Sequence, residues 1–282
     1  MAASGDRNSA LEADWLEVSR SAARAVRSAV DAHPDLADRA RVTGRGEGGD
    51  DSLVIDSAAE DAVLAELEKL ALPLTVISEE MGRVEIAGGG PVTVVVDPVD
   101  GSLNAKRDLP LWALSIAVAS GPTMADVEFG YVANPDTGEE WWAQRSEGAY
   151  GGGTRLDAPA RGSRLEFLGV ESAHPPLVSA AAGALAGSGA HRLRMIGSVA
   201  LSLCLVADGR FDAMLSLRDV RSVDAAAGQL IVREAGGAVA FPAAGDRAAP
   251  LDLEMRSRVF AGRTASLLET ALAIGPRPSR GR

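Results

Sequence analysis

Acidic side chains stand at the edges of three apolar segments of this sequence. They are Glu79 and Glu80 after "LTVIS", Asp97 and Asp100 after "VTVVV", and Asp224 at the start of "VDAAAG". Because ligands of α/β proteins gather at the carboxyl ends of strands, we expect these groups to meet at one site. Packed carboxylates repel one another and retain protons unless a cation neutralises them. Oxygen ligands of this kind suit Mg²⁺, which also keeps water and substrate phosphate in its coordination shell.

The stretch "DPVDGSLN" adds an anion-binding turn to this acidic set. Pro98 fixes its own φ and restricts the residue before it, so the chain turns sharply with both carboxylates on one side. The carbonyl of Val99 could face the cation, and Gly101 permits close backbone approach. The N–H groups of Gly101 and Ser102, opening a short helix, would point at a phosphate. An Asp-Pro turn capped by Asp100 is the simpler alternative, and the other acidic groups weigh against it.

The elements that must position these residues alternate between helical and extended patterns, which indicates an α/β (α+β) fold. Apolar spacing predicts a helix over residues 10–40, whereas residues 52–70 begin extended and become helical. The continuous apolar run that starts at Val92 predicts a strand buried on both faces. An antiparallel series of short strands is expected between 113 and 156. Further helices are predicted near 177–186, over 198–209 and over 223–237, with strands between them.

The composition limits the classes of partner. The chain carries a formal net charge of −11, which repels nucleic acid, and no apolar run is long enough to span a membrane. The N-terminal residues show no secretory signal. Cys204 is the only cysteine and lies in an apolar helical pattern, so we expect a buried thiol and a reducing, cytoplasmic location.

Six motifs in the right order resemble the Mg²⁺-dependent, lithium-sensitive phosphatases of the inositol monophosphatase superfamily. "DPVDGSLN" is similar to the signature DP(I/V/L)DG(T/S)xN of that family, and "ISEE" is similar to its GEE, with Ser78 in place of the glycine. The upstream "VIDSAAEDAV" resembles the acidic helix start of the family, through Asp56 and Glu60. The remaining matches are "GYVANPDTGEEWWAQRSEGAYGGG", "GSVALSLCLVADGRFDA" and "VDAAAGQLIVREAGG", and the motifs together cover most of residues 50 to 240.

The resemblance implies a layered αβαβα sandwich, usually a homodimer, and a site of two or three Mg²⁺ ions. Mn²⁺ is a possible substitute and Li⁺ a possible inhibitor. The implied metal ligands are Glu79, Asp97, the Val99 carbonyl, Asp100 and Asp224. Glu79 and Ser102, with Ser102 paired to Asp56, would orient and deprotonate an attacking water molecule. The loop over residues 43–51 matches a segment that often helps to hold a further, weaker metal ion.

The substrate is the point at which this sequence departs from the inositol-specific members. Those members carry a glutamate that contacts the ring hydroxyls, and this chain has Ser216 or Leu217 near that position. Those members also have a tryptophan directly before the last aspartate, and this chain has Val223 there. The pattern is more similar to the archaeal-type branch, whose members hydrolyse fructose 1,6-bisphosphate and inositol monophosphate. Arginine suits bidentate phosphate contact. The expected substrate-binding residues are Asp100, Gly101, Ser102 and Ser198, with Arg194, Arg218 and Arg221 for a second phosphate.

We therefore expect a Mg²⁺-dependent phosphomonoesterase acting on inositol monophosphate or a related small sugar phosphate. The alternatives are a fructose-1,6-bisphosphatase or dual-activity enzyme, a histidinol-phosphate or 3′-phosphoadenosine 5′-phosphate phosphatase, and a phospho-ligand-binding or interaction module without catalysis. Residues 1–150 are expected to form an N-terminal subdomain with the metal site and residues 151–275 a second subdomain that completes it. Residues 276–282 are expected to be a disordered tail.

Overall fold

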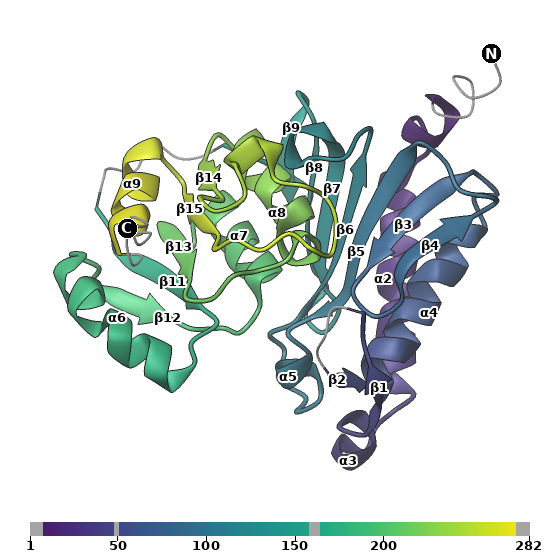
Figure 1. Ribbon diagram of the computed structural model, residues 1–282, viewed down its shortest axis with the longest axis horizontal. Coiled ribbons are helices and arrows are strands. Elements are labelled where there is room, and N and C mark those ends of the chain that lie inside the picture. Colours follow the sequence, from purple (N-terminus) through teal and green to yellow (C-terminus); the bar gives the residue numbers. More distant parts are fainter. Residues whose placement is uncertain (1–7, 48–50, 158–163, 275–282) are drawn as a thin grey trace, which may run out of the picture.

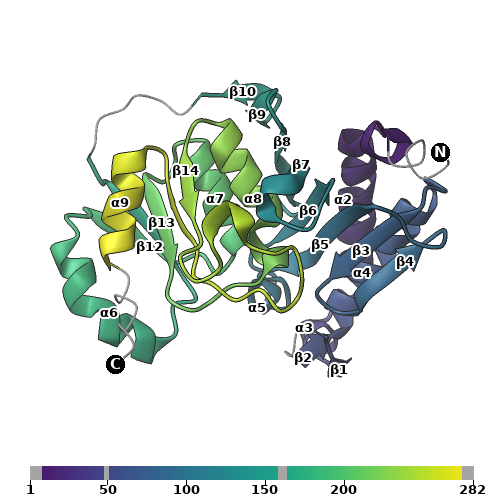
Figure 2. The same ribbon diagram turned by 45° about the horizontal axis from the view of Figure 1, so that its top comes forward.

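The chain folds into five alternating layers of helices and sheets, as a computed structural model shows for residues 8–47, 51–157 and 164–274. Helices α2 (Trp15–Asp31) and α4 (Val54–Glu68) cover one face of an eight-stranded sheet (Figure 1). Helices α7 (Val199–Ala207) and α8 (Ser222–Glu234) lie between this sheet and a five-stranded sheet. Helices α6 and α9 cover the outer face of the smaller sheet. Figure 2 shows the same order of layers from a second direction. This arrangement is the αβαβα sandwich that the sequence predicts.

The larger sheet has the strand order β10-β9-β8-β7-β6-β5-β3-β4, in which only the β3–β5 pair is parallel. Its strands are β3 (Leu74–Ser78), β4 (Gly82–Ile86), β5 (Val92–Asp100), β6 (Ala113–Ala119), β7 (Val127–Asn134), β8 (Glu139–Gln144), β9 (Gly148–Gly151) and β10 (Thr154–Leu156). Strand β5 is buried over most of its length because α4 packs on one face and α8 on the other, as its apolar run predicts.

The smaller sheet has the order β12-β11-β13-β15-β14, with β11 parallel to both of its neighbours and the other pairs antiparallel. Its strands are β11 (Phe167–Glu171), β12 (Arg192–Arg194), β13 (Ala213–Ser216), β14 (Ala238–Ala240) and β15 (Phe260–Gly262). A separate exposed hairpin joins β1 (Val42–Arg45) to β2 (Asp51–Leu53). The predicted subdomain boundary at residues 150 and 151 falls within β9, and the division into subdomains stays a prediction.

The helices agree with the expected positions except near the N-terminus and over residues 265–274, where no helix was predicted. They are α2 (Trp15–Asp31), α3 (Leu36–Arg39), α4 (Val54–Glu68), α5 (Ser102–Ala105), α6 (Pro175–Gly187), α7 (Val199–Ala207), α8 (Ser222–Glu234) and α9 (Ala265–Ile274). The single helix predicted over residues 10–40 is wrong, because Pro34 disfavours helical geometry at the residue before it and Asp35 starts a new helix by capping Ala37 N–H. Cys204 is buried in α7, as expected.

Helix α8 lies very close to the larger sheet. A Cβ at Gly130 of β7 would stand 2.8 Å from the carbonyl oxygen of Ala227 in α8, so only glycine allows this approach without a shift. The close packing fixes the N-terminus of α8 beside the end of β5. Among the described residues, no helix is both long and apolar enough to cross a membrane. The predicted tail, residues 276–282, lies outside the described part of the chain.

Candidate metal centre

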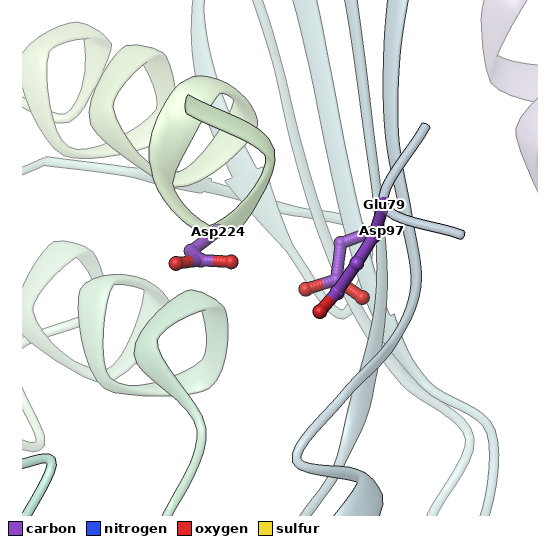
Figure 3. Close-up of side chains that lie close together, drawn as sticks. All are labelled: Glu79, Asp97 and Asp224. Carbon is purple, nitrogen blue, oxygen red and sulfur yellow. The ribbon is translucent and has the colours of Figure 1, made fainter. Parts of the chain in front are cut away.

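Three carboxylates from distant parts of the sequence meet between the larger sheet and α8. Glu79 directly follows β3, Asp97 lies on β5, and Asp224 lies in the first turn of α8. One carboxylate oxygen of each residue lies within 4.8 Å of the others (Figure 3). Figure 3 shows Asp224 reaching from the helix toward Glu79 and Asp97 on the sheet side. The structure thus brings together acidic groups that the sequence separates by up to 145 residues.

Local hydrogen bonds hold two of these carboxylates in place. Asp97 Oδ1 accepts the N–H of Val99 at 3.0 Å, a turn that the intervening proline permits. Asp224 Oδ2 accepts the N–H of Arg221 at 2.8 Å and so caps the start of α8. A carboxylate in this first turn also interacts favourably with the positive end of the helix dipole.

Asp100 faces a different set of partners. A register shift between Asp97 and Asp100 in the β5–β6 pairing marks a bulge at the end of β5. Asp100 Oδ2 accepts hydrogen bonds from Ser198 Oγ and Ala200 N, both at 2.6 Å. Asp100 is therefore oriented by the start of α7, and the three-carboxylate cluster of Glu79, Asp97 and Asp224 does not include it.

The electrostatics of the site fit a cation. Burial raises the pKa of Glu79 to about 8 and that of Asp100 to about 7, and it raises the pKa of Asp97 well above its usual range. The negative charges of neighbouring carboxylates, Asp224 among them, raise all three pKa values further. Buried carboxylates that repel one another become stable as anions when a divalent cation lies among them, and an all-oxygen donor set suits Mg²⁺ or Mn²⁺.

Asp56 and Ser102 stand next to this cluster. Asp56 Oδ2 accepts the N–H of Leu53 at 3.0 Å, while Oδ1 is buried without a hydrogen-bond partner in the described part of the chain. Burial raises the pKa of Asp56 to about 6, and the nearby Ser102 hydroxyl opposes this shift. In this structure, however, Ser102 Oγ donates to the carbonyl of Val99 at 3.0 Å. The predicted pairing of Ser102 with Asp56 therefore requires the hydroxyl to rotate away from Val99.

The turn that precedes Ser102 has the backbone that glycine favours. Gly101 has a φ of 102°, and a Cβ there would stand 3.0 Å from the carbonyl oxygen of Leu111 and 3.2 Å from that of Gly197. Asn104 secures the same region, because its Nδ2 donates to the carbonyls of Leu111 at 2.7 Å and Ile196 at 2.8 Å. These hydrogen bonds connect the turn after β5 to the turn before α7.

A cavity of about 870 Å³ opens above the acidic cluster. The sequence-predicted residues that line it are Glu79, Asp97, Val99, Asp100, Gly101, Ser102, Arg218, Arg221 and Asp224. Asp56 and Ser198 are not lining residues, although Ser198 contacts Asp100. Arg194 is also absent from the lining, because its guanidinium lies 4.5 Å from the ring centroid of Phe167. The contact of Arg194 with substrate therefore stays a prediction, and the position of its guanidinium against Phe167 does not favour it.

Arg256 and Glu171 are among the cavity residues that were not predicted from the sequence. Arg256 comes from the loop before β15 and could be found only from the tertiary fold. Glu171 ends β11 and is buried, and burial raises its pKa to about 7. It accepts hydrogen bonds from Ser202 Oγ at 2.6 Å and Gly197 N at 2.8 Å, so it secures the turn before α7. The strand-end rule that identified Glu79 and Asp97 would also have identified Glu171.

The loop that was expected to assist a further metal ion is described only in part. Glu47 N donates to the carbonyl of Glu80 at 3.0 Å, and a Cβ at Gly46 would stand 2.8 Å from Glu80 Oε2. Close to the Glu79–Glu80 pair, Glu60 Oε1 accepts the N–H of Met81 at 3.1 Å. The described end of the loop therefore lies against an acidic region next to the cluster.

A layered αβαβα fold with largely buried carboxylates beneath an arginine-bearing cavity is suited to a metal-dependent phosphatase. The model of the inositol monophosphatase family matches residues 12–274, and the chain belongs to that family. This family assignment makes the protein a phosphatase and a hydrolase.

Named relatives and a solved structure agree with this assignment. A fructose-1,6-bisphosphatase/inositol-1-monophosphatase of Methanothermobacter thermautotrophicus is 33% identical over 276 residues, which cover 90% of this chain and 94% of the relative. A protein of the same name from Archaeoglobus fulgidus is 36% identical over 234 residues, covering 81% and 84%. A solved inositol monophosphatase–fructose 1,6-bisphosphatase superposes with a TM-score of 0.80 at 25% identity, covering 93% of this chain and 99% of that one.

Proposed function

We propose that the protein is a Mg²⁺-dependent phosphomonoesterase that hydrolyses inositol monophosphate and also accepts fructose 1,6-bisphosphate. The observation that carries this proposal is the meeting of Glu79, Asp97 and Asp224 within 4.8 Å beneath a cavity with several arginines. The names of the archaeal relatives support the dual substrate range. The cavity volume of about 870 Å³ leaves room for either sugar phosphate.

The proposed metal ligands are Glu79, Asp97, Asp100, Asp224 and the Val99 carbonyl, holding two or three Mg²⁺ ions. Bound Mg²⁺ supplies Lewis-acid polarisation of the phosphoryl oxygens and lowers the pKa of a coordinated water molecule. Glu79, Asp97 and Asp224 contribute oxygens that already face one another. Mn²⁺ is expected to substitute and Li⁺ to inhibit.

The proposed proton path uses the chain's own residues. Ser102 lines the cavity, and the neighbouring Asp56 has one buried oxygen without a hydrogen-bond partner among the described residues. A rotated Ser102 hydroxyl can donate to Asp56 Oδ1 and accept a hydrogen bond from the attacking water molecule. Asp56, with a pKa of about 6, is then a base near neutral pH. Glu79 is proposed to orient the same water molecule.

The proposed phosphate contacts divide between two ends of the cavity. The N–H groups of Gly101 and Ser102 receive the reacting phosphate. Ser198 orients Asp100, because its hydroxyl donates to that carboxylate at 2.6 Å. Arg218 is exposed on the cavity wall and is the proposed contact for the second phosphate of a bisphosphate, with Arg256 beside the same cavity.

A comparison of substrates tests this proposal. Phosphate release is measured with Mg²⁺ on inositol 1-phosphate, fructose 1,6-bisphosphate, histidinol phosphate and 3′-phosphoadenosine 5′-phosphate. We expect the highest kcat/KM values on the first two. Activity confined to either of the last two would contradict the proposed substrate class, and no release from any ester would favour a non-catalytic role.

We further propose that the protein is a homodimer and acts in the cytoplasm. The buried single thiol of Cys204 supports a reducing compartment, because no intrachain disulfide can form. Light scattering coupled to size-exclusion chromatography tests the oligomeric state, and a mass near that of one chain would contradict the dimer.

A further inference from the structure

Arg221 lines the cavity, but its guanidinium is engaged by carboxylates of the acidic cluster. Its Nη2 donates to Glu79 Oε1, and its Nε lies 3.9 Å from Asp224 Oδ1. Its backbone N–H donates to Asp224 Oδ2 at 2.8 Å. One residue thus contacts two carboxylates of the cluster, one on the sheet side and one on α8.

These contacts are largely shielded from water. The side chains of Arg221, Glu79 and Asp224 are 14%, 17% and 14% exposed. Separating a buried ion pair is unfavourable because it leaves charges without compensation in a poorly solvated place. Arg218, by contrast, is exposed on the same cavity wall and can meet an incoming anion without such a loss.

The geometry of a carboxylate allows Glu79 to serve two partners at once. Arg221 engages Oε1, which leaves Oε2 for a cation shared with Asp97 and Asp224. The guanidinium is planar and always charged, so it fixes the orientation of the carboxylate and offsets part of the repulsion in the cluster. Hydrogen bonds of this kind orient metal-ligating carboxylates, and their loss typically weakens metal binding.

We propose that Arg221 is a positioning residue of the metal centre, which holds Glu79 and Asp224 at the separation that the cation needs, and that it does not bind the second phosphate. The proposal rests on the function proposed above. It reassigns an arginine that the sequence placed among the substrate contacts.

The test measures Mg²⁺ binding by titration calorimetry in the absence of substrate. Relative to the parent protein, Arg221→Met should bind Mg²⁺ about 10- to 100-fold more weakly. Arg221→Lys keeps the charge but loses the planar fork, so its affinity should lie between the two. Arg218→Met is the matched control and should bind like the parent. Unchanged or tighter Mg²⁺ binding by Arg221→Met would overturn the proposal. Unchanged binding is expected if Arg221 has no role at the metal centre, and tighter binding is expected if Arg221 competes with the cation for the carboxylates.

Two further readouts separate the possible failures. If the parent protein does not bind Mg²⁺, the proposed function itself fails; if the parent binds and Arg221→Met binds equally well, only the role of Arg221 fails. Raising Mg²⁺ should restore turnover of Arg221→Met on both inositol 1-phosphate and fructose 1,6-bisphosphate. A loss confined to the bisphosphate and insensitive to Mg²⁺ would assign Arg221 to the second phosphate. Circular dichroism establishes that each variant is folded, and Arg221→Lys tests the role if Arg221→Met is not.

Discussion

Replacing Asp100 with asparagine should stabilise the protein without metal while it impairs catalysis. Asparagine has the same shape, and its Oδ1 can still accept the hydrogen bonds from Ser198 Oγ and Ala200 N. The substitution removes a buried negative charge that burial and Asp224 destabilise. The parent protein retains this charge at a cost to stability, which is expected of a residue kept for function.

The size of the effect follows from the pKa of Asp100. Its rise from the usual 3.8 to about 7 corresponds to roughly 4 kcal/mol at ~1.36 kcal/mol per pKa unit. Water that enters the cavity screens part of the charge, so we expect Asp100→Asn to raise the free energy of unfolding by about 2–4 kcal/mol at pH 7. For a chain of this size, that increase raises Tm by about 3–7 °C.

Calorimetric melting in EDTA across a pH series checks both sign and size. A carboxyl group with a raised folded-state pKa gives its full stability below the unfolded value of 3.8 and loses it as pH rises through about 7. The advantage of Asp100→Asn should therefore be smallest below about pH 4, grow between about pH 4 and 7, and level off toward pH 8. Saturating Mg²⁺ should stabilise the parent protein more than the variant. A variant less stable than the parent in EDTA at pH 8, or one with near-normal turnover, would refute this reasoning.

Four other substitutions test the remaining parts of the site. Ser102→Ala should lower kcat more than it raises KM in steady-state kinetics. The losses of activity from Ser102→Ala and Asp56→Asn should be less than additive in the double variant, and additive losses would contradict a shared proton path. Arg218→Ala should lower kcat/KM for fructose 1,6-bisphosphate by about 10- to 150-fold, from roughly 1.5–3 kcal/mol, and spare inositol 1-phosphate; equal losses on both would remove Arg218 from the second phosphate. Gly101→Ala should reduce the free energy of unfolding by about 1–3 kcal/mol in urea titration, because its Cβ would crowd the Leu111 carbonyl at a φ of 102°; an unchanged midpoint would contradict this.

The acidic cluster could be predicted because its signals are local. Glu79 and Asp97 follow the mainly apolar runs "LTVIS" and "VTVVV", and Asp224 stands at the start of the helical stretch "VDAAAG". The smaller sheet was harder, since β14 and β15 have three residues each, too few for an alternating pattern to stand out. The break between α2 and α3 was missed although Pro34 marks it.

The arginines could not be assigned from the sequence because their directions depend on tertiary contacts. Arg221 and Asp224 are three residues apart, which is a capping spacing, but the contact of Arg221 with Glu79 joins residues 142 positions apart. Arg194 looked equivalent in the sequence, yet its guanidinium stacks on Phe167 at the edge of the smaller sheet. Arg256 reaches the cavity from a loop that has no distinguishing motif.

The most direct measurement is the initial rate of phosphate release from inositol 1-phosphate as Mg²⁺ is titrated into EDTA-treated protein. The parent protein should be inactive without Mg²⁺ and saturate as the ion is added. Asp97→Asn, which removes one carboxylate of the cluster, should require far more Mg²⁺ or remain inactive while staying folded. A rate that does not depend on Mg²⁺, or an Asp97→Asn protein with the same Mg²⁺ dependence as the parent, would contradict a metal centre at Glu79, Asp97 and Asp224.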